Sequence, residues 1–148
     1  MKKNVIVTGS DKKYYPFLKN LVNSLINSNS LEICDLCILD VENESQYLSE
    51  IEDKITKKKK ANYNLNIFFK DRQDWFKLLT ERPFMKDYFP GYEKYIWMDA
   101  DTEVLSSDGI VNLINACEDK ELAIAPEISE SYVFKNSKFG IKKIFKSF

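Results

Sequence analysis

The chain has 148 residues, of which 44% are hydrophobic and 30% charged, and its formal net charge is −1. This length and composition suit one compact domain over residues 1–148 and exclude an intrinsically disordered chain. The near-balanced charge gives no reason to expect nucleic acid as a partner, and the complete lack of histidine excludes Ser-His-Asp and Cys-His mechanisms.

The beginning of the chain predicts a strand, a helix and a second strand. Residues 4–8 predict a first strand, which the turn residues 9–11 end. Pro16 stands near the start of the helix, where a missing N–H costs least. A second strand is predicted within residues 31–41. The helix has an apolar stripe at helical spacing, made of Leu18, Leu21, Val22, Leu25 and Ile26.

The same region indicates the compartment. The segment before the first strand is too short for a signal peptide or a membrane span, so we expect a cytoplasmic protein. An odd number of cysteines then indicates free thiols. Cys34 and Cys37 have the spacing of a metal or redox pair, but residues three apart on a strand face opposite sides. We therefore assign no zinc or redox chemistry to them.

The middle of the chain continues the alternation of helices and strands. Residues 45–55 predict a helix, and the four lysines at 57–60 suit the carboxyl end of a helix. Residues 64–69 predict a third strand. Residues 71–88 predict a further helix, which Pro83 kinks or restarts.

An apolar run at residues 95–98 leads into two carboxylates, Asp99 and Asp101. Alternate residues on a strand point the same way, so both should lie on one side at the strand's carboxyl end, where open α/β sheets bind ligands. Two adjacent carboxylates repel each other unless a cation lies between them, which makes the pair a natural site for a hard metal ion. Two solvated turn acids are the simpler alternative.

The remaining residues predict a helix over 110–117 with a Ser or Asp cap, a strand over 122–126 and a last helix over 136–148. The last helix is amphipathic and basic, a type that can touch a membrane surface, although packing on the sheet is the interpretation we favour. Strands that alternate with helices predict an α/β fold with a mostly parallel sheet.

Two segments, residues 11–25 and residues 89–104, resemble the nucleotide-sugar half of GT-A glycosyltransferases. They are most similar to the family 8 type, which includes glycogenin-like enzymes and bacterial galactosyl- and glucosyltransferases. The resemblance extends from residue 4 to about residue 128 and implies a Rossmann-like GT-A fold. It also implies transfer of a sugar from a nucleotide sugar, with UDP as the expected nucleotide, to an unknown glycan, lipid or protein acceptor.

The resemblance implies that the loop after the first strand holds the uridine. Thr8, Ser10, Asp11 and Tyr14 match the positions of that loop. Tyr14 could stack on the uracil face, and Asp11 could accept a hydrogen bond from the base N–H. The alternative for Tyr14 is an aromatic residue at a helix start that packs on the sheet.

The resemblance also implies a metal and diphosphate site. Asp99 and Asp101 match the family's D-x-D pair, which would hold Mn²⁺ or Mg²⁺ against the donor diphosphate. Ala100 between them would let the backbone approach the ribose. Arg82 matches an arginine at the donor site, where a guanidinium would pair with phosphate or with a carboxylate. A solvated helix charge is the alternative for Arg82.

Two features depart from the family pattern. Family members bring a further metal ligand, typically a histidine, and this sequence has none. They also continue with further strands after the helix that matches residues 136–148. We therefore expect a truncated, amino-terminal half, whose uncovered sheet edge would favour an oligomer or a partner chain.

Two other functions stay open at this point. An apolar strand followed by D-x-D also opens the motif of haloacid dehalogenase phosphotransferases, although Glu103 stands where Thr or Val is typical. In addition, that motif normally follows the first strand of the fold. The other alternative is a non-catalytic nucleotide-sugar-binding or assembly subunit, because the resemblance implies that the family's acceptor segments follow the part matched here.

Overall fold

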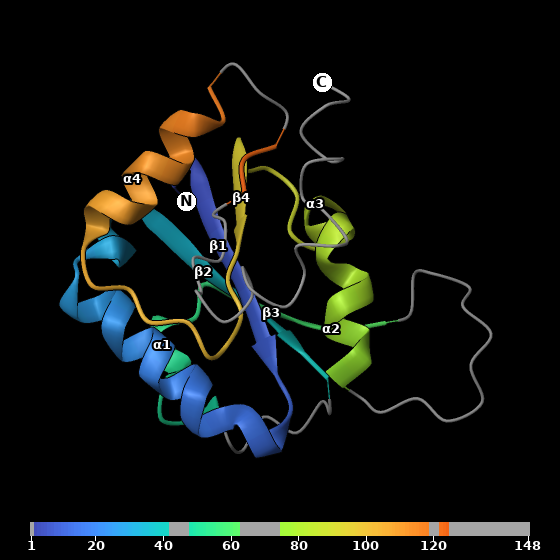
Figure 1. The fold of residues 1–148 in the computed structure, drawn as a ribbon. Helices are drawn as coiled ribbons and strands as arrows, with labels where there is room; N and C mark the ends of the chain where they lie inside the picture. Colours follow the sequence, from blue (N-terminus) through green and yellow to red (C-terminus); the bar gives the residue numbers. More distant parts are fainter. Residues whose placement is uncertain (1, 42–47, 63–74, 119–121, 125–148) are drawn as a thin grey trace, which may run out of the picture.

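The computed structural model describes residues 2–41, 48–62, 75–118 and 122–124. Within them, four strands form one sheet in the order β3-β2-β1-β4, and every neighbouring pair is parallel (Figure 1). The predicted Rossmann-like α/β fold with a mostly parallel sheet is confirmed. The strands are β1 (Asn4–Ser10), β2 (Cys34–Asp40), β3 (Lys57–Lys60) and β4 (Lys94–Trp97).

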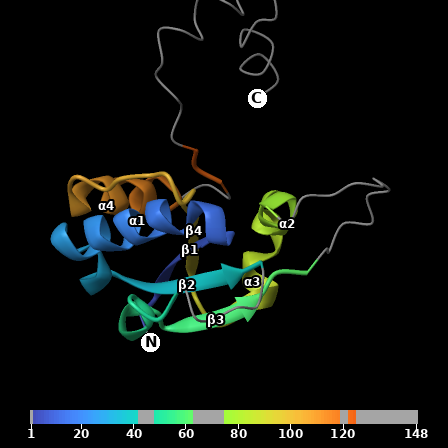
Figure 2. The same ribbon diagram turned by 90° about the horizontal axis from the view of Figure 1, so that it is seen from below.

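Helices cover both faces of this sheet. α1 (Tyr15–Asn27) and α4 (Ser107–Ala116) lie together on one face, and α2 (Trp75–Glu81) and α3 (Met85–Tyr88) lie on the other (Figure 2). No helix in the described part of the chain is long and apolar enough to cross a membrane. Four short 3₁₀ turns complete the described elements: η1 (Lys12–Tyr14), η2 (Ser30–Glu32), η4 (Glu52–Lys54) and η5 (Arg82–Phe84).

Two hydrophobic clusters lie on the opposite faces of the sheet. The cluster beneath α1 and α4 contains Ile6 of β1 and Cys34 of β2, together with most of the predicted stripe of α1. The cluster beneath α2 and α3 contains Val7 and Cys37. Adjacent strand residues thus point to opposite faces, and the prediction that Cys34 and Cys37 face apart is confirmed.

Local signals placed two helix boundaries correctly. Ser106 caps α4, because its hydroxyl accepts a hydrogen bond from the backbone N–H of Asp108 at 3.2 Å. The predicted break at Pro83 is also present: α2 ends at Glu81, η5 contains the proline, and α3 starts at Met85.

Other predicted elements are wrong. The described part of the helix predicted over 45–55 forms turns, in which Leu48 and Ile51 are buried without continuous helix. The lysines at 57–60 form β3 and not a helix end, since the chain reaches β2 through a hydrogen bond from Thr56 N to Leu36 O at 2.7 Å. Residues 122–124 form no strand. The strand predicted over 64–69 and the helix predicted over 136–148 lie outside the described residues.

A lysine-rich strand is physically reasonable at this place. β3 is the outermost of the described strands on its side of the sheet. Lysines on an outer strand discourage pairing with another chain, and their aliphatic stems can still cover apolar surface. Lys57 does so, with its ammonium 5.3 Å from the centre of the Tyr92 ring.

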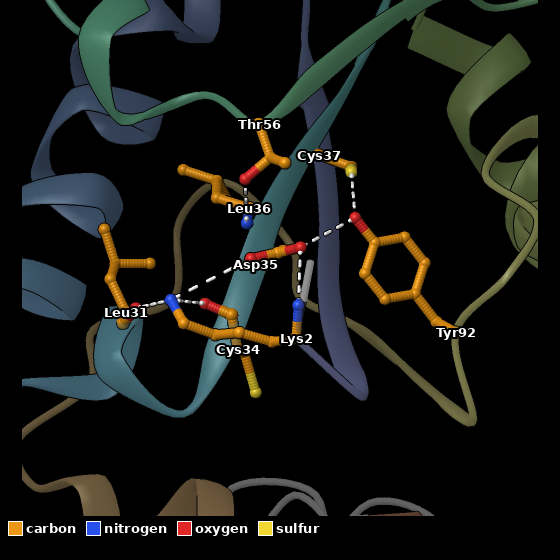
Figure 3. Close-up of polar contacts among 8 residues, drawn as sticks. All are labelled: Lys2, Leu31, Cys34, Asp35, Leu36, Cys37, Thr56 and Tyr92. Carbon is orange, nitrogen blue, oxygen red and sulfur yellow. Dashed lines mark hydrogen bonds and ion pairs between the residues drawn. The ribbon is translucent and has the colours of Figure 1, made fainter.

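A buried carboxylate ties the start of the chain to β2 and to the turn before β4 (Figure 3). Asp35 of β2 is 8% exposed and accepts hydrogen bonds from the Tyr92 hydroxyl at 3.0 Å and the Lys2 backbone N–H at 3.1 Å. The Lys2 ammonium lies 3.8 Å from the same carboxylate. Burial, and then the hydrogen bond to Asp35, raises the pKa of Tyr92, so the phenol stays protonated and donates.

Removing the Tyr92 hydroxyl should therefore destabilise the fold. We expect Tyr92→Phe to lower the free energy of unfolding by about 1.5–3 kcal/mol, the usual range for a hydrogen bond to a charged group. Urea denaturation followed by circular dichroism would measure it. Tyr14→Phe is the matched control, because Tyr14 is 42% exposed and should change stability by less than about 0.5 kcal/mol. Equal stabilities for the two variants would contradict this role of Asp35.

The three thiols should differ sharply in reactivity. Burial raises the pKa of Cys34 to about 11 and also raises the pKa of Cys37, whereas Cys117 is partly exposed. Because only the thiolate reacts, a disulfide reagent at pH 8 should modify Cys117 rapidly and the other two only on unfolding. Absorbance of the released thiolate measures the rates, and Cys117→Ser should remove the fast phase. Rapid modification of more than one thiol in the native protein would contradict the buried placement.

Candidate functional site

A cavity of about 380 Å³ opens where β1 and β4 end. β1 has β2 on one side and β4 on the other, so the strand order reverses direction at this point. Ligands of open α/β sheets bind at such a switch point, just outside the carboxyl ends of the strands. The cavity is lined by Gly9, Ser10, Asp11, Lys13, Tyr14, Leu78, Leu79, Arg82, Trp97, Asp99, Ala100 and Asp101.

The loop after β1 is held by a cap at the start of the helical segment. Asp11 precedes η1, and its Oδ1 accepts a hydrogen bond from the Tyr14 backbone N–H at 2.9 Å. The cap fixes the positions of Asp11 and Tyr14 relative to each other. Tyr14 is 42% exposed, and the Lys13 ammonium lies over its ring, 5.4 Å from the ring centre.

Gly9 allows α2 to approach this loop. A Cβ atom at Gly9 would lie 2.4 Å from the carbonyl oxygen of Leu39 and 2.6 Å from Cδ2 of Leu78. Real Cβ atoms do not approach backbone oxygen so closely, so a residue with a side chain would push β2 or α2 away. This glycine therefore sets the distance between β1 and the helix that lines the far side of the cavity.

Asp99 is anchored by two donors from different elements. Nη2 of Arg82 donates to Asp99 Oδ1 at 2.5 Å, and Nε1 of Trp97 donates to the same oxygen at 2.8 Å. The Arg82 guanidinium also stacks over the indole of Trp97, 5.1 Å from the ring centre. The three side chains form one polar cluster on the wall of the cavity.

The carboxylates follow the strand rather than belonging to it. β4 ends at Trp97, and the last bond toward β1 runs from Met98 N to Val7 O at 3.1 Å. The Thr102 N–H then bonds to Asp99 O at 3.0 Å and closes a turn. The prediction that both acids share one side because they alternate along a strand is therefore wrong, since they lie in the turn after β4. The turn nonetheless leaves both Asp99 and Asp101 on the wall of one cavity.

The donor set fits a hard divalent cation. Asp101 is exposed, and both N–H donors of the Asp99 cluster bind Oδ1, so they leave Oδ2 to other partners. Carboxylate oxygens are the ligands that Mg²⁺ and Mn²⁺ prefer, and Mg²⁺ commonly takes only one or two of them besides phosphates and water. The described residues contain no group of three or more acidic or cysteine side chains placed to hold an ion.

Seven of the eight predicted site positions line this single cavity; Thr8 does not. Thr8 lies in β1, fully buried, and its Oγ1 has no hydrogen-bond partner among the described residues. It alternates with Ile6, so it points to the face that α1 covers. The nucleotide and metal roles of the eight residues stay predictions.

The comparison with family models follows this geometry. Residues 5–146 match the model of glycosyl transferase family 8, which is nearly the whole chain. The chain belongs to glycosyltransferase family 8. This assignment decides against the haloacid dehalogenase alternative, and it agrees with the all-parallel sheet. Comparison with curated proteins gives no match.

Family 8 membership implies a nucleotide-sugar donor and an acceptor, so the cavity between β1 and β4 is the candidate donor site. Five lining residues were missed by sequence reasoning. Gly9 and Trp97 carried a signal, because each lies near the end of a strand that borders the site. Leu78 and Leu79 fall within the helix predicted over 71–88, where nothing local distinguishes a leucine that lines a cavity from one in the core. The five are Gly9, Lys13, Leu78, Leu79 and Trp97.

Gly9→Ala tests whether close packing at β1 shapes the cavity. We expect a loss of about 1–3 kcal/mol in unfolding free energy, because the added methyl group overlaps backbone and Leu78. Gly109→Ala is the matched control: its Cβ meets nothing within 4 Å, and alanine in α4 should stabilise by about 0.5–1 kcal/mol. Thermal and urea unfolding would measure both. An unchanged or raised stability of Gly9→Ala would contradict the close approach.

Proposed function

We propose that this family 8 glycosyltransferase binds a UDP-sugar in the cavity between β1 and β4 and transfers the sugar with a divalent ion held by Asp99 and Asp101. The proposal rests on one observation: side chains of the required kinds line the same cavity. Two carboxylates, a guanidinium and an exposed tyrosine ring, from three separate segments of the chain, line one cavity. A nucleoside diphosphate needs this combination of an aromatic face and cationic groups.

In this proposal the uridine of the donor contacts the loop after β1. Tyr14 offers a ring face for the uracil, and the Asp11 carboxylate beside it can accept from the base N–H. Ser10 lies at the end of β1 on the same wall. The cap between Asp11 and Tyr14 holds both groups before a ligand arrives, which lowers the ordering cost of binding.

In this proposal the diphosphate of the donor lies next to Asp99 and Asp101. When bound, Mn²⁺ or Mg²⁺ would neutralise charge on the leaving diphosphate. Arg82 and Lys13 line the same cavity and add positive charge beside that group. Trp97 positions the Asp99 carboxylate through its indole N–H, so that Asp99 meets the ion in one orientation.

A donor-binding subunit without catalysis is the second candidate function. One observation favours it: Asp99 and Asp101 lie in one turn, and the described residues group no third acidic or cysteine ligand with them. A site with so few protein ligands relies on the donor phosphates and water to complete the coordination of the ion. Both candidates share the same ligand, UDP with a divalent ion, and they differ in turnover.

Asp101→Asn tests the proposed donor site. Asp101 is exposed in the cavity, so the substitution removes charge without disturbing the fold. In the presence of Mn²⁺ we expect UDP affinity to fall by about tenfold or more, a loss of at least about 1.4 kcal/mol. Without a divalent ion, the variant and the original chain should bind UDP equally weakly. Isothermal titration calorimetry measures both conditions.

Asp87→Asn is the matched control, because it removes an exposed carboxylate on α3, away from the cavity. It should leave UDP affinity unchanged. Absence of any Mn²⁺-dependent binding by the original chain would refute the donor site. Hydrolysis or transfer of the sugar from a UDP-sugar, absent in Asp101→Asn, would then separate the enzyme from the binding subunit.

A further inference from the structure

A second cavity, of about 560 Å³, adjoins the candidate donor site. It runs between α1 and the loop of residues 100–105, and we call it the α1 groove. Ala100 and Asp101 line both the donor cavity and the α1 groove, so the two spaces meet at the proposed metal-binding turn. A group bound in the α1 groove would therefore lie next to the diphosphate end of the donor.

One wall of the α1 groove carries a row of amides. Asn20, Asn23 and Asn27 all line it and all are exposed. Their spacing places them on one side of α1. Asparagine is a poor helix former, and exposed helix positions ordinarily take Lys, Glu or Ala. Residues that disfavour the secondary structure in which they lie are expected where function requires them.

The other wall is a fixed loop with outward carboxylates. Ala100 and Val104 pack against the core cluster beneath α1 and α4. Val104 N donates to Oγ of Ser24, a residue that is 8% exposed, at 3.0 Å, and this hydroxyl donates to Leu21 O at 2.7 Å. These hydrogen bonds hold the loop against α1. Asp101 and Glu103 remain exposed and line the groove.

An aromatic pair connects the two cavities. The rings of Tyr14 and Phe17 lie 5.8 Å apart, and both are exposed, at 42% and 48%. Tyr14 lines the donor cavity, whereas Phe17 lines the α1 groove. An exposed ring beside polar side chains offers a flat apolar surface for the C–H face of a pyranose.

We propose that the α1 groove binds the acceptor and that the acceptor is a saccharide. This inference rests on the proposed donor site. Sugar hydroxyls both donate and accept hydrogen bonds, and an amide side chain can accept through its oxygen and donate through its NH₂ group. The carboxylate of Glu103 accepts from a further hydroxyl. A lipid chain would need a mostly apolar groove, whereas three amides and two carboxylates line this one besides its apolar residues.

Saturation-transfer difference NMR tests the proposal, with lactose, cellobiose and maltose as probes in the presence of UDP and Mn²⁺. We expect a signal from at least one disaccharide. The double variant Asn23→Ala/Asn27→Ala should weaken that binding by roughly tenfold, since it removes two hydrogen-bonding side chains. UDP affinity should stay unchanged. Alanine favours the helix, so the loss would not come from unfolding.

Asn115→Ala is the matched control, an exposed asparagine on α4 outside the groove, and it should leave disaccharide binding unchanged. UDP binding without a signal from any disaccharide would overturn the acceptor groove and leave the donor site standing, whereas loss of both would overturn both. Displacement of the disaccharide by UDP-glucose or UDP-galactose, but not by UDP, would assign the groove to the donor sugar and overturn the acceptor assignment.

Discussion

The parallel pairing of β1 with β4 is the constraint on which the candidate site depends. Their register sets Asn4 opposite Lys94 and Val7 opposite Trp97, so the loops that follow both strands emerge at the same edge of the sheet. One loop brings Asp11 and Tyr14, and the other brings the two carboxylates. A register change by one residue would turn the indole of Trp97 to the opposite face and separate it from Asp99.

The electrostatics of the site follow from that pairing together with the break at Pro83. Two carboxylates in one cavity repel each other, and a neighbouring positive side chain offsets this repulsion. Arg82 does so, because the chain turns at η5 and directs the guanidinium to Asp99. The ion pair is partly exposed, with the Arg82 side chain 36% and the Asp99 side chain 51% accessible, so its contribution to stability is small. Its value lies in orientation: it holds one acid in place and leaves the second open to the cavity.

The wrong predictions share one physical origin, because they relied on local patterns where burial decided the outcome. Apolar residues at 48, 51 and 55 fit a helical stripe, yet turns bury Leu48 and Ile51 in the same cluster just as well. Four consecutive lysines carry no strand pattern of their own. They form β3 because β2 offers a row of backbone partners along which Lys57 pairs with Cys37 and Lys60 with Asp40. Backbone pairing of this kind is independent of side-chain polarity, provided that the charged ends reach water.

The sequence by itself determined the features that short-range physics encodes: the stripe of α1, the cap of α4, the break at Pro83, the apolar strand before the paired acids and the resemblance to family 8. Periodicity, proline geometry and motif spacing all act within a few residues, so they can be read without coordinates. Only the tertiary structure decided which side chains meet. Arg82 and Asp99 are 17 positions apart, and Val104 and Ser24 are 80 apart. Such contacts depend on how strands pair and helices pack, and no local pattern specifies them.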